Sequence, residues 1–83
     1  MFHRIRSIVP MSEYSLSVCF ENGEQKIYYV RQLFKKFEAF EAMTVTEGLF
    51  RQVKVDAGGY GVSWNDDIDL SCDELYQGGR NVS

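Results

Sequence analysis

The stretch between residues 50 and 78 constrains the fold more strongly than any other part of this 83-residue chain. Apolar and polar residues alternate over residues 52–56 and again over residues 60–64, and Gly58 and Gly59 separate the two segments. A period of two is typical of strands with one buried face, and glycine pairs favour the turn between antiparallel strands. This part of the chain therefore predicts a β-hairpin.

A short helix is predicted after the hairpin. Residues 65–70 form an acidic corner, and Ser71-Cys72-Asp73-Glu74 then has the spacing of a capping box. In this motif the Ser71 hydroxyl accepts a hydrogen bond from the Glu74 amide, and the Glu74 side chain reaches back to the Ser71 amide. Gly78 is expected to end this helix, because glycine readily adopts the conformation that follows a helix C-terminus.

Three antiparallel strands are predicted at the start of the chain. Residues 14–20 alternate with a period of two, and Asn22-Gly23 supplies the two positive-φ residues of a type I′ turn. Residues 25–30 then return as a strand. An earlier strand over residues 4–9 is expected to pair with residues 14–20 across a loop at residues 10–13.

The period changes to that of a helix after residue 30. Leu33, Phe34, Phe37 and Phe40 recur at helical spacing, which predicts a helix, broken or partly 3₁₀, between residues 31 and 42 with these side chains in the core. Residues 43–48 are expected to form a connection to the second hairpin.

Together these elements predict an α+β fold, with an antiparallel sheet of about five strands in the order β-β-β-α-β-β-α. We expect residues 1–78 to form a single domain and residues 79–83 a flexible C-terminal tail. The chain is 45% apolar and 14% aromatic, which suffices for one aromatic core and argues against disorder.

Composition favours a cytoplasmic protein. The longest apolar runs are far shorter than the roughly 18–20 residues that span a bilayer, and the N-terminus lacks an apolar region of signal-peptide length. Cys19 and Cys72 lack the spacing of a metal site, and a secreted domain of this size usually carries several disulfides. We therefore expect reduced thiols, no cofactor, no metal and no membrane partner.

Charge is distributed unevenly along the chain, whose net charge is −3. Residues 1–36 contain six basic and three acidic residues, whereas residues 37–83 contain three basic and nine acidic residues. Either this asymmetry polarises the surface and steers a partner, or the two halves neutralise each other in the fold. We favour the second alternative, because a domain this small interleaves its halves.

Two patterns resemble ligand sites without meeting their requirements. Residues 58–61 join two predicted strands, whereas a phosphate-binding loop opens a helix. The acidic corner at residues 65–70 lacks the Gly and Glu that complete an EF-hand loop. It is better explained as a turn stabilised by its own Asn and Asp side chains.

No catalytic set of residues is evident either. His3 is the sole histidine, so nucleophilic catalysis with a histidine base would depend on one residue near the chain end. Asp69 could pair with Asp73 or Glu74 for acid–base chemistry, but Glu74 already has a capping role and so small a domain lacks a deep cleft. The basic residues near Arg31 lie beside core phenylalanines, and the negative net charge disfavours nucleic-acid binding. We expect that the chain is not an enzyme and has no direct nucleic-acid contact.

Aromatic residues are the remaining candidates for a functional surface. Tyr28 and Tyr29 are adjacent in one predicted strand, so at least one of them faces outward. Tyr60 and Trp64 either lie at an interface, where aromatic residues beside a polar rim are common, or line the core beneath the short helix. The sequence leaves these alternatives open.

Several short segments occur in the order and spacing of one known family: Ile8-Val9-Pro10, Tyr14-Ser15-Leu16, Phe20-Glu21-Asn22-Gly23-Glu24, Leu49-Phe50, Val53-Lys54-Val55-Asp56, Gly61-Val62-Ser63-Trp64-Asn65, Ile68-Asp69-Leu70-Ser71 and Glu74-Leu75-Tyr76. On these residues the chain resembles the bacterial family called domain of unknown function 2442. The resemblance implies a small α+β fold with a curled antiparallel sheet and short helices. It also implies a mostly free-standing protein, often encoded beside another small protein in toxin–antitoxin-like pairs. The family commonly has Gly after Trp-Asn, where this chain has Asp66 or Asp67.

We therefore expect a non-catalytic interaction module of a bacterial cytoplasmic protein, which forms a homodimer or binds a co-encoded small protein. The contact is expected at an open strand edge or at the corner that contains Tyr60, Trp64, Asn65, Asp66 and Asp67. The alternative is an antitoxin-like or transcription-associated component that acts through a partner.

Overall fold

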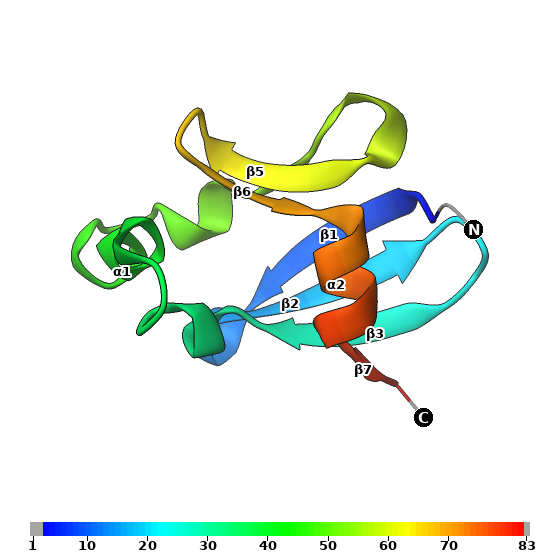
Figure 1. Ribbon diagram of the computed structural model, residues 1–83, viewed down its shortest axis with the longest axis horizontal. Helices are drawn as coiled ribbons and strands as arrows, with labels where there is room; N and C mark the ends of the chain where they lie inside the picture. The colour runs from blue at the N-terminus through cyan, green and yellow to red at the C-terminus, as the bar shows by residue number, and fades with distance from the viewer. Residues whose placement is uncertain (1–2, 83) are drawn as a thin grey trace.

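The computed structural model describes residues 3–82 and contains two antiparallel sheets that share one core (Figure 1). The first sheet has four strands in the order β1-β2-β3-β7, and the second has three in the order β4-β5-β6. The strands are β1 Ile5–Met11, β2 Ser15–Phe20, β3 Gln25–Tyr29, β7 Arg80–Asn81, β4 Lys54–Val55, β5 Gly61–Asn65 and β6 Ile68–Ser71. The α+β expectation is confirmed, although the strands are divided between two sheets.

Two helices complete the fold. Helix α1, Glu38–Val45, lies at one end of the molecule, and α2, Cys72–Gly78, contacts β3, β5 and β6 (Figure 1). Helix α2 thereby joins the two sheets. Neither helix in the described range 3–82 is long and apolar enough to cross a membrane.

The alternation predicted over residues 14–20 is observed in β2. The side chains of Leu16, Val18 and Phe20 are completely buried in the core. Ser17 and Cys19 face the other way and are partly exposed. The period of two in the sequence therefore orients this strand correctly.

Strand β1 runs further than predicted and includes Pro10 and Met11. Pro10 lies opposite Leu16 in the register. Because β1 is an edge strand, a residue without an N–H donor is tolerated there. The expected loop at residues 10–13 is thereby reduced to the 3₁₀ turn Ser12–Tyr14.

The turn between β2 and β3 is not the predicted type I′ turn. Gly23 has a positive φ of 93°, whereas Asn22 does not have a positive φ. The side-chain oxygen of Asn22 accepts a hydrogen bond of 2.9 Å from the Glu24 amide, and the Gly23 amide donates to the carbonyl of Phe20 at 3.0 Å. The Asn22 side chain therefore stabilises this turn as an Asx turn, with glycine at the position that requires a positive φ.

The helix predicted over residues 31–42 is broken. A 3₁₀ turn, Val30–Leu33, is separated from α1 by residues 34–37, and α1 extends through residues 43–45, where a connection was expected. Leu33 and Phe40 are buried, but Phe37 adopts an extended conformation and is 54% exposed. A continuous helix would have placed all three side chains on one face, so the break removes Phe37 from the core.

The acidic corner contains a strand that was not predicted. Residues 68–71 form β6, in which Ile68 and Leu70 are buried while Asp69 and Ser71 are exposed. This alternation has the period of a strand, but it follows directly on a cluster of turn-forming residues. In the second hairpin, β4 is shorter than predicted, because residues 50–52 form a 3₁₀ turn.

The expected flexible tail over residues 79–83 is corrected for Arg80 and Asn81. These two residues form β7, in which Asn81 pairs with Lys26 and Arg80 with Ile27. Ser83 lies outside the described residues. The C-terminal segment therefore contributes the fourth strand of the first sheet.

Glycine has a packing role at the end of α2 rather than the predicted role as a stop. Helix α2 includes Gly78, and the following Gly79 has a φ of −80°. A Cβ atom on Gly78 would lie 2.8 Å from the Tyr28 ring, and one on Gly79 would lie 3.0 Å from the Cβ atom of Lys26. The two glycines therefore allow close approach between α2 and β3.

Candidate interaction surfaces

The predicted acidic residues lie on the turn between β5 and β6. Asn65, Asp66 and Asp67 are all exposed. The side-chain oxygen of Asn65 accepts hydrogen bonds from the amides of Asp67 and Ile68, at 2.9 and 3.0 Å. Asn65 is therefore committed to holding the turn, and the two aspartates remain available at the surface.

Trp64 belongs to the core and not to this surface. Its side chain is 3% exposed, and its indole N–H donates a hydrogen bond of 3.0 Å to the carbonyl of Phe50. The ring also makes an edge contact with Phe40 at a centroid distance of 5.8 Å. Of the two alternatives that the sequence left open for Trp64, the core alternative is correct.

Tyr60 is exposed but lies at the opposite end of β5 from the aspartates. Its hydroxyl accepts a hydrogen bond of 3.1 Å from Arg4, and the Arg4 guanidinium lies 5.3 Å from the centre of the ring. The six residue steps from Tyr60 to Asp66 span roughly 20 Å along an extended strand. The five predicted site residues therefore do not form one continuous surface.

The capping box is only half formed. The Ser71 hydroxyl accepts a hydrogen bond of 3.1 Å from the Glu74 amide, as predicted. The Glu74 carboxylate, however, accepts a hydrogen bond of 2.8 Å from the hydroxyl of Tyr28. Burial, together with this bond, raises the pKa of Tyr28 above its usual value. Glu74 is therefore a structural acceptor, which argues against the acid–base pairing considered from the sequence.

A second polar cluster joins α2 to the start of β3. The hydroxyl of Tyr76 donates a hydrogen bond of 2.6 Å to Glu24, which raises the pKa of Tyr76 and lowers that of Glu24. The ammonium of the buried Lys26 donates to the Tyr76 carbonyl at 2.6 Å and lies 3.8 Å from the centre of the Tyr76 ring. The His3 ring stacks on the same tyrosine at 3.6 Å. These groups satisfy one another's hydrogen-bonding capacity, which is typical of a polar cluster that holds two elements together.

Cys72 does not have the environment of a reactive thiol. Both cysteines are free, and Cys72 is buried with its sulfur 3.1 Å from the carbonyl oxygen of His3. Burial, with a contribution from Asp73, raises the pKa of the Cys72 thiol, so less of the reactive thiolate forms. Among residues 3–82, no group of three or more His, Cys, Asp or Glu side chains is arranged to hold a metal ion.

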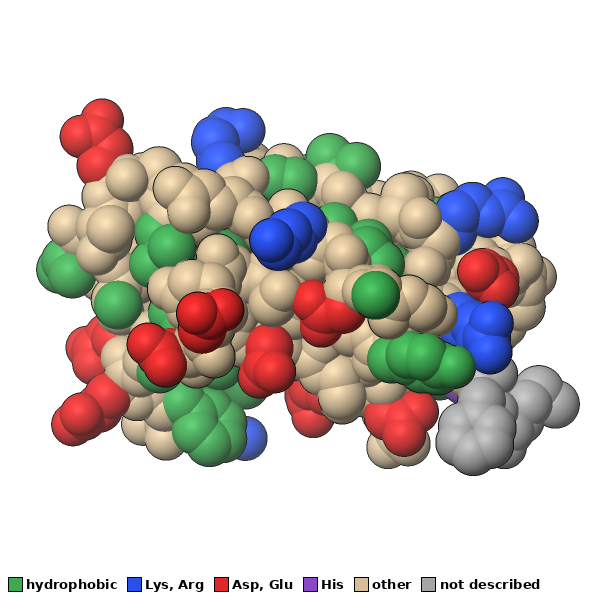
Figure 2. Space-filling model, turned by 90° about the horizontal axis from the view of Figure 1, so that it is seen from above, with side chains coloured by type: hydrophobic (Ala, Val, Ile, Leu, Met, Phe, Trp, Pro, Cys, Tyr) green, Lys and Arg blue, Asp and Glu red, His purple; other side chains and the backbone are tan. Residues whose placement is uncertain are grey.

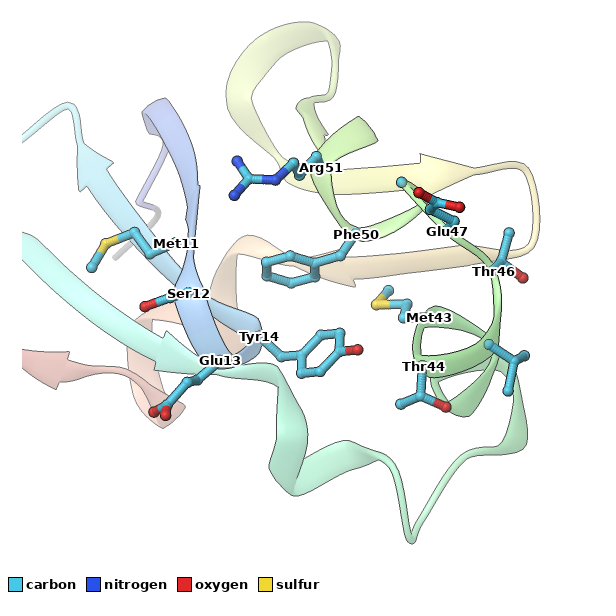
Figure 3. A pocket seen from close by; sticks show the side chains of 12 residues that line it. Met11, Ser12, Glu13, Tyr14, Met43, Thr44, Thr46, Glu47, Phe50 and Arg51 are labelled. Carbon is cyan, nitrogen blue, oxygen red and sulfur yellow. The ribbon is translucent and has the colours of Figure 1, made fainter.

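A hollow of about 530 Å³ lies between the turn before β2 and the end of α1 (Figure 3). Tyr14, Met43 and Phe50 line its apolar part, and Figure 3 shows Glu13 on one side of it and Arg51 and Glu47 on the other. Because these charges are separated and of opposite sign, they do not converge on one ligand group, as the polar groups of a small-molecule site do.

The backbone beside this hollow is strained. Glu13 and Tyr14 are consecutive non-glycine residues with positive φ values of 60° and 59°. The Tyr14 ring makes edge contacts with Phe34 and Phe50 at centroid distances of 5.1 and 5.4 Å. Since each left-handed residue costs roughly 1–2 kcal/mol, this aromatic packing offsets part of the strain.

The outer face of the four-stranded sheet is a surface that sequence reasoning did not identify. The register places three rows of side chains on this face: Met11, Ser15 and Tyr29; Val9, Ser17 and Ile27; and Ser7, Cys19 and Gln25. None of these nine side chains is charged. At the edge of the sheet, Arg80 of β7 lies opposite Ile27 and adds a positive charge to the middle row, with its guanidinium 5.9 Å from the centre of the Tyr29 ring. Small residues of β2 lie in the middle of each row, so the face has a shallow trough between two ridges.

Both ridges of this outer face carry large exposed apolar side chains. Val9 and Met11 of β1 are 54% and 41% exposed, and Tyr29 of β3 is 48% exposed. Tyr29 thus fulfils the prediction that one of the two adjacent tyrosines faces outward, since Tyr28 is buried. The contribution of Met11 was missed because the first strand was expected to end at Val9.

The comparisons with known proteins assign the chain to a family without assigning an activity. The model of the family described as "Protein of unknown function (DUF2442)" matches residues 5–81. No curated protein and no solved structure matches the chain significantly. The family match begins at β1 and ends at β7, so it covers both sheets and both helices. The chain therefore belongs to the DUF2442 family.

Proposed function

We propose that this domain is a non-catalytic interaction module of a bacterial cytoplasmic protein, and that it binds a second copy of itself through the outer face of the four-stranded sheet. The observation that carries the proposal is the exposure of Val9, Met11 and Tyr29 on a face to whose paired rows β1, β2 and β3 contribute no charged side chain. Apolar side chains in a contiguous exposed patch are typical of protein–protein contact sites.

Charge and shape both favour a second copy as the occupant. Two copies of a chain with a net charge of −3 repel each other, and that repulsion is weakest where the paired rows of the contacting faces carry no acidic side chains. A two-fold axis would place the ridge that contains Val9 in the trough over Ser17 of the other copy. Such a self-complementary contact is the usual basis of a symmetric dimer.

The size of the face limits the affinity. The strand spacing and the rise per residue give this face roughly 300 Å² per copy, so two copies would bury roughly 600 Å². Stable complexes bury about 1,200 Å² or more. The expected dimer is therefore weak, with a dissociation constant on the order of tens of micromolar.

Sedimentation velocity over about 5–200 µM protein tests the proposal. The sedimentation coefficient of the wild-type protein should rise with concentration, whereas Val9→Lys should remain a monomer because it places a charge on the ridge. Val45→Lys is the matched control, since Val45 is 83% exposed on α1 and is not part of the four-stranded sheet. A wild-type protein that stays monomeric at all concentrations would contradict dimerisation.

The same face could instead bind a small protein encoded beside this one, as the family resemblance suggests. In that case the purified neighbour should form a complex with the wild-type domain and with Val45→Lys, but not with Val9→Lys. That outcome would favour a regulatory pair of the antitoxin type over a homodimer. If Val9→Lys bound as tightly as the wild type, the outer face would not be the contact.

A further inference from the structure

Strand β6 is the outer strand of the three-stranded sheet, and part of its backbone faces outward. The Cys72 amide donates to the carbonyl of Tyr60 at 2.9 Å, and Leu70 lies opposite Val62. Because hydrogen-bonded positions alternate along an antiparallel ladder, the bonds to β5 are made by Leu70. The amides of Asp69 and Ser71 then face the outer edge, where an incoming strand can bind them.

An apolar groove lies directly beside this edge. Its volume is about 390 Å³, and its walls include Leu33, Phe37, Phe40 and Leu70. Phe37 stands at the surface with about half of its side chain exposed. A large aromatic residue left exposed beside buried apolar neighbours is typical of the centre of a binding site.

The rim of the groove is acidic. Asp67, Asp69 and Glu74 all line it. No Lys or Arg occurs between residues 55 and 79, whereas six Asp and Glu residues do. Figure 2 shows most of the visible acidic side chains in the lower half of the view. This half corresponds to the side that faces the viewer in Figure 1, where α2 lies in front of the first sheet. A surface of one sign of charge beside a groove attracts a ligand of the opposite sign.

We propose that this groove binds an extended segment of another protein in which apolar residues alternate with Lys or Arg, and that the segment adds a strand to the outer edge of β6. Main-chain hydrogen bonds to Asp69 and Ser71 hold the segment in register. Its apolar side chains enter the groove beside Phe37, and its basic side chains approach Asp67 and Asp69. Strand addition of this kind takes affinity from the backbone and specificity from alternate side chains.

This second surface is separate from the outer face of the four-stranded sheet. The residues that line the groove come from the 3₁₀ turn Val30–Leu33, Phe37 and the start of α1, Asp67 in the turn before β6, β6 itself and α2. None belongs to β1 or β2. A segment held here leaves Val9 and Met11 free. The domain would then connect a second copy on one face with a basic partner segment on another.

The test is a titration of the full chain with a capped peptide of about ten residues that alternates Val with Lys. Amide chemical shifts in NMR spectra report the contact, and we expect the largest changes at Asp69, Leu70 and Ser71. A peptide with Glu in place of Lys is the matched control and should produce no shifts at these positions. Performing the titration also on Val9→Lys separates this proposal from dimerisation, because that variant should bind the peptide normally.

Charge-reversal variants test the acidic rim. Asp69→Lys and Asp67→Lys should each weaken peptide binding about tenfold, because a buried or closely approached charge pair is replaced by repulsion. Asp66→Lys makes the same charge change on the adjacent residue, which does not line the groove, and should weaken binding by less than about threefold. The absence of shifts at Asp69 and Ser71 with about 1 mM basic peptide would overturn the proposal.

Two further outcomes would also contradict it. Equal shifts with the acidic and the basic peptide would show that charge does not select the ligand. Shifts at Asp69 and Ser71 that depend on protein concentration without peptide would show that a second copy, and not a basic partner, occupies the groove. Either result leaves the proposal for the outer sheet face unaffected, since that one depends on Val9.

Discussion

The hydroxyl of Tyr28 donates a hydrogen bond of 2.8 Å to the carboxylate of Glu74 and so joins the centre of β3 to the first turn of α2. Tyr28 is completely buried, whereas Glu74 is exposed. One end of the bond is therefore fixed by the core, and the other end can exchange with water. This bond is also the reason that Glu74 does not complete the capping box.

We predict that Tyr28→Phe lowers the free energy of unfolding by about 1 kcal/mol, the usual net value of one hydrogen bond. The ring remains to fill the core, and the exposed Glu74 carboxylate regains water, so the loss should not be larger. Urea denaturation measures the difference. Tyr29→Phe is the matched control, because Tyr29 is exposed, and it should change the midpoint little.

Stability should also fall at alkaline pH. In the folded protein the pKa of Tyr28 is raised above its ordinary value of 10.0, chiefly by burial. Tyr28 therefore makes its full contribution to the free energy of unfolding below about pH 10. As the pH rises further, this tyrosine ionises in the unfolded chain but resists ionisation in the folded protein, so the contribution is lost. The pKa of Tyr76 is also raised, by its bond to Glu24, and acts in the same direction.

Urea midpoints at pH 8 and at pH 11 measure this effect. The wild-type midpoint should decrease between the two values, and the decrease should be smaller in Tyr28→Phe, which has no group to ionise at that position. An equal decrease in both proteins would assign the alkaline loss of stability to other groups.

The N-cap of α2 provides a separate prediction. Ser71→Ala should cost about 1 kcal/mol, because the Glu74 amide loses the acceptor that now lies 3.1 Å away. In a domain of this size that corresponds to a fall of about 4–8 °C in melting temperature. Ser7→Ala, on the exposed end of β1, is the control. An unchanged melting temperature in Ser71→Ala would show that the hydroxyl does not stabilise the helix.

The sequence predicted those elements whose pattern is local. The alternation in residues 14–20 placed Leu16, Val18 and Phe20 in the core, and the Ser71 spacing located the start of α2. It did not reveal β7, because Arg80 and Asn81 carry no apolar pattern and pair with β3 through their backbones. Strand β6 was missed because the adjacent turn-forming residues obscured a four-residue alternation.

The candidate surfaces were less predictable, because they depend on contacts between distant residues. The position of Trp64 is settled by a bond to the Phe50 carbonyl, 14 residues away. The acidic turn at Asp66 and Asp67 was placed correctly on the surface. The position of Phe37 beside this turn depends on the break between the 3₁₀ turn Val30–Leu33 and α1. The helical spacing of the phenylalanines does not indicate that break.

The free thiols provide a prediction about metal and redox dependence. The double variant Cys19→Ser, Cys72→Ser should fold, and a chelator should leave its melting temperature and that of the wild type unchanged. At the buried position 72, the serine hydroxyl can still donate a hydrogen bond to the His3 carbonyl, as the Cys72 sulfur does now. A chelator-induced fall of several degrees would contradict this, because structural metal binding and folding are coupled in small domains.

The strained turn before β2 gives the last prediction, and it has the opposite sign. Glu13 has a φ of 60° and an exposed side chain, so Glu13→Gly removes a left-handed penalty of roughly 1–2 kcal/mol. The substitution also gives the unfolded chain more freedom, which costs roughly 0.5–1 kcal/mol. The net result should be a gain of about 0.5 kcal/mol in the free energy of unfolding.

Glu21→Gly is the matched control: Glu21 is exposed in the next turn and does not have a positive φ, so this variant should be destabilised. Urea denaturation of both proteins decides the matter, and a loss of stability in Glu13→Gly would mean that the Glu13 side chain makes a contribution larger than the backbone strain.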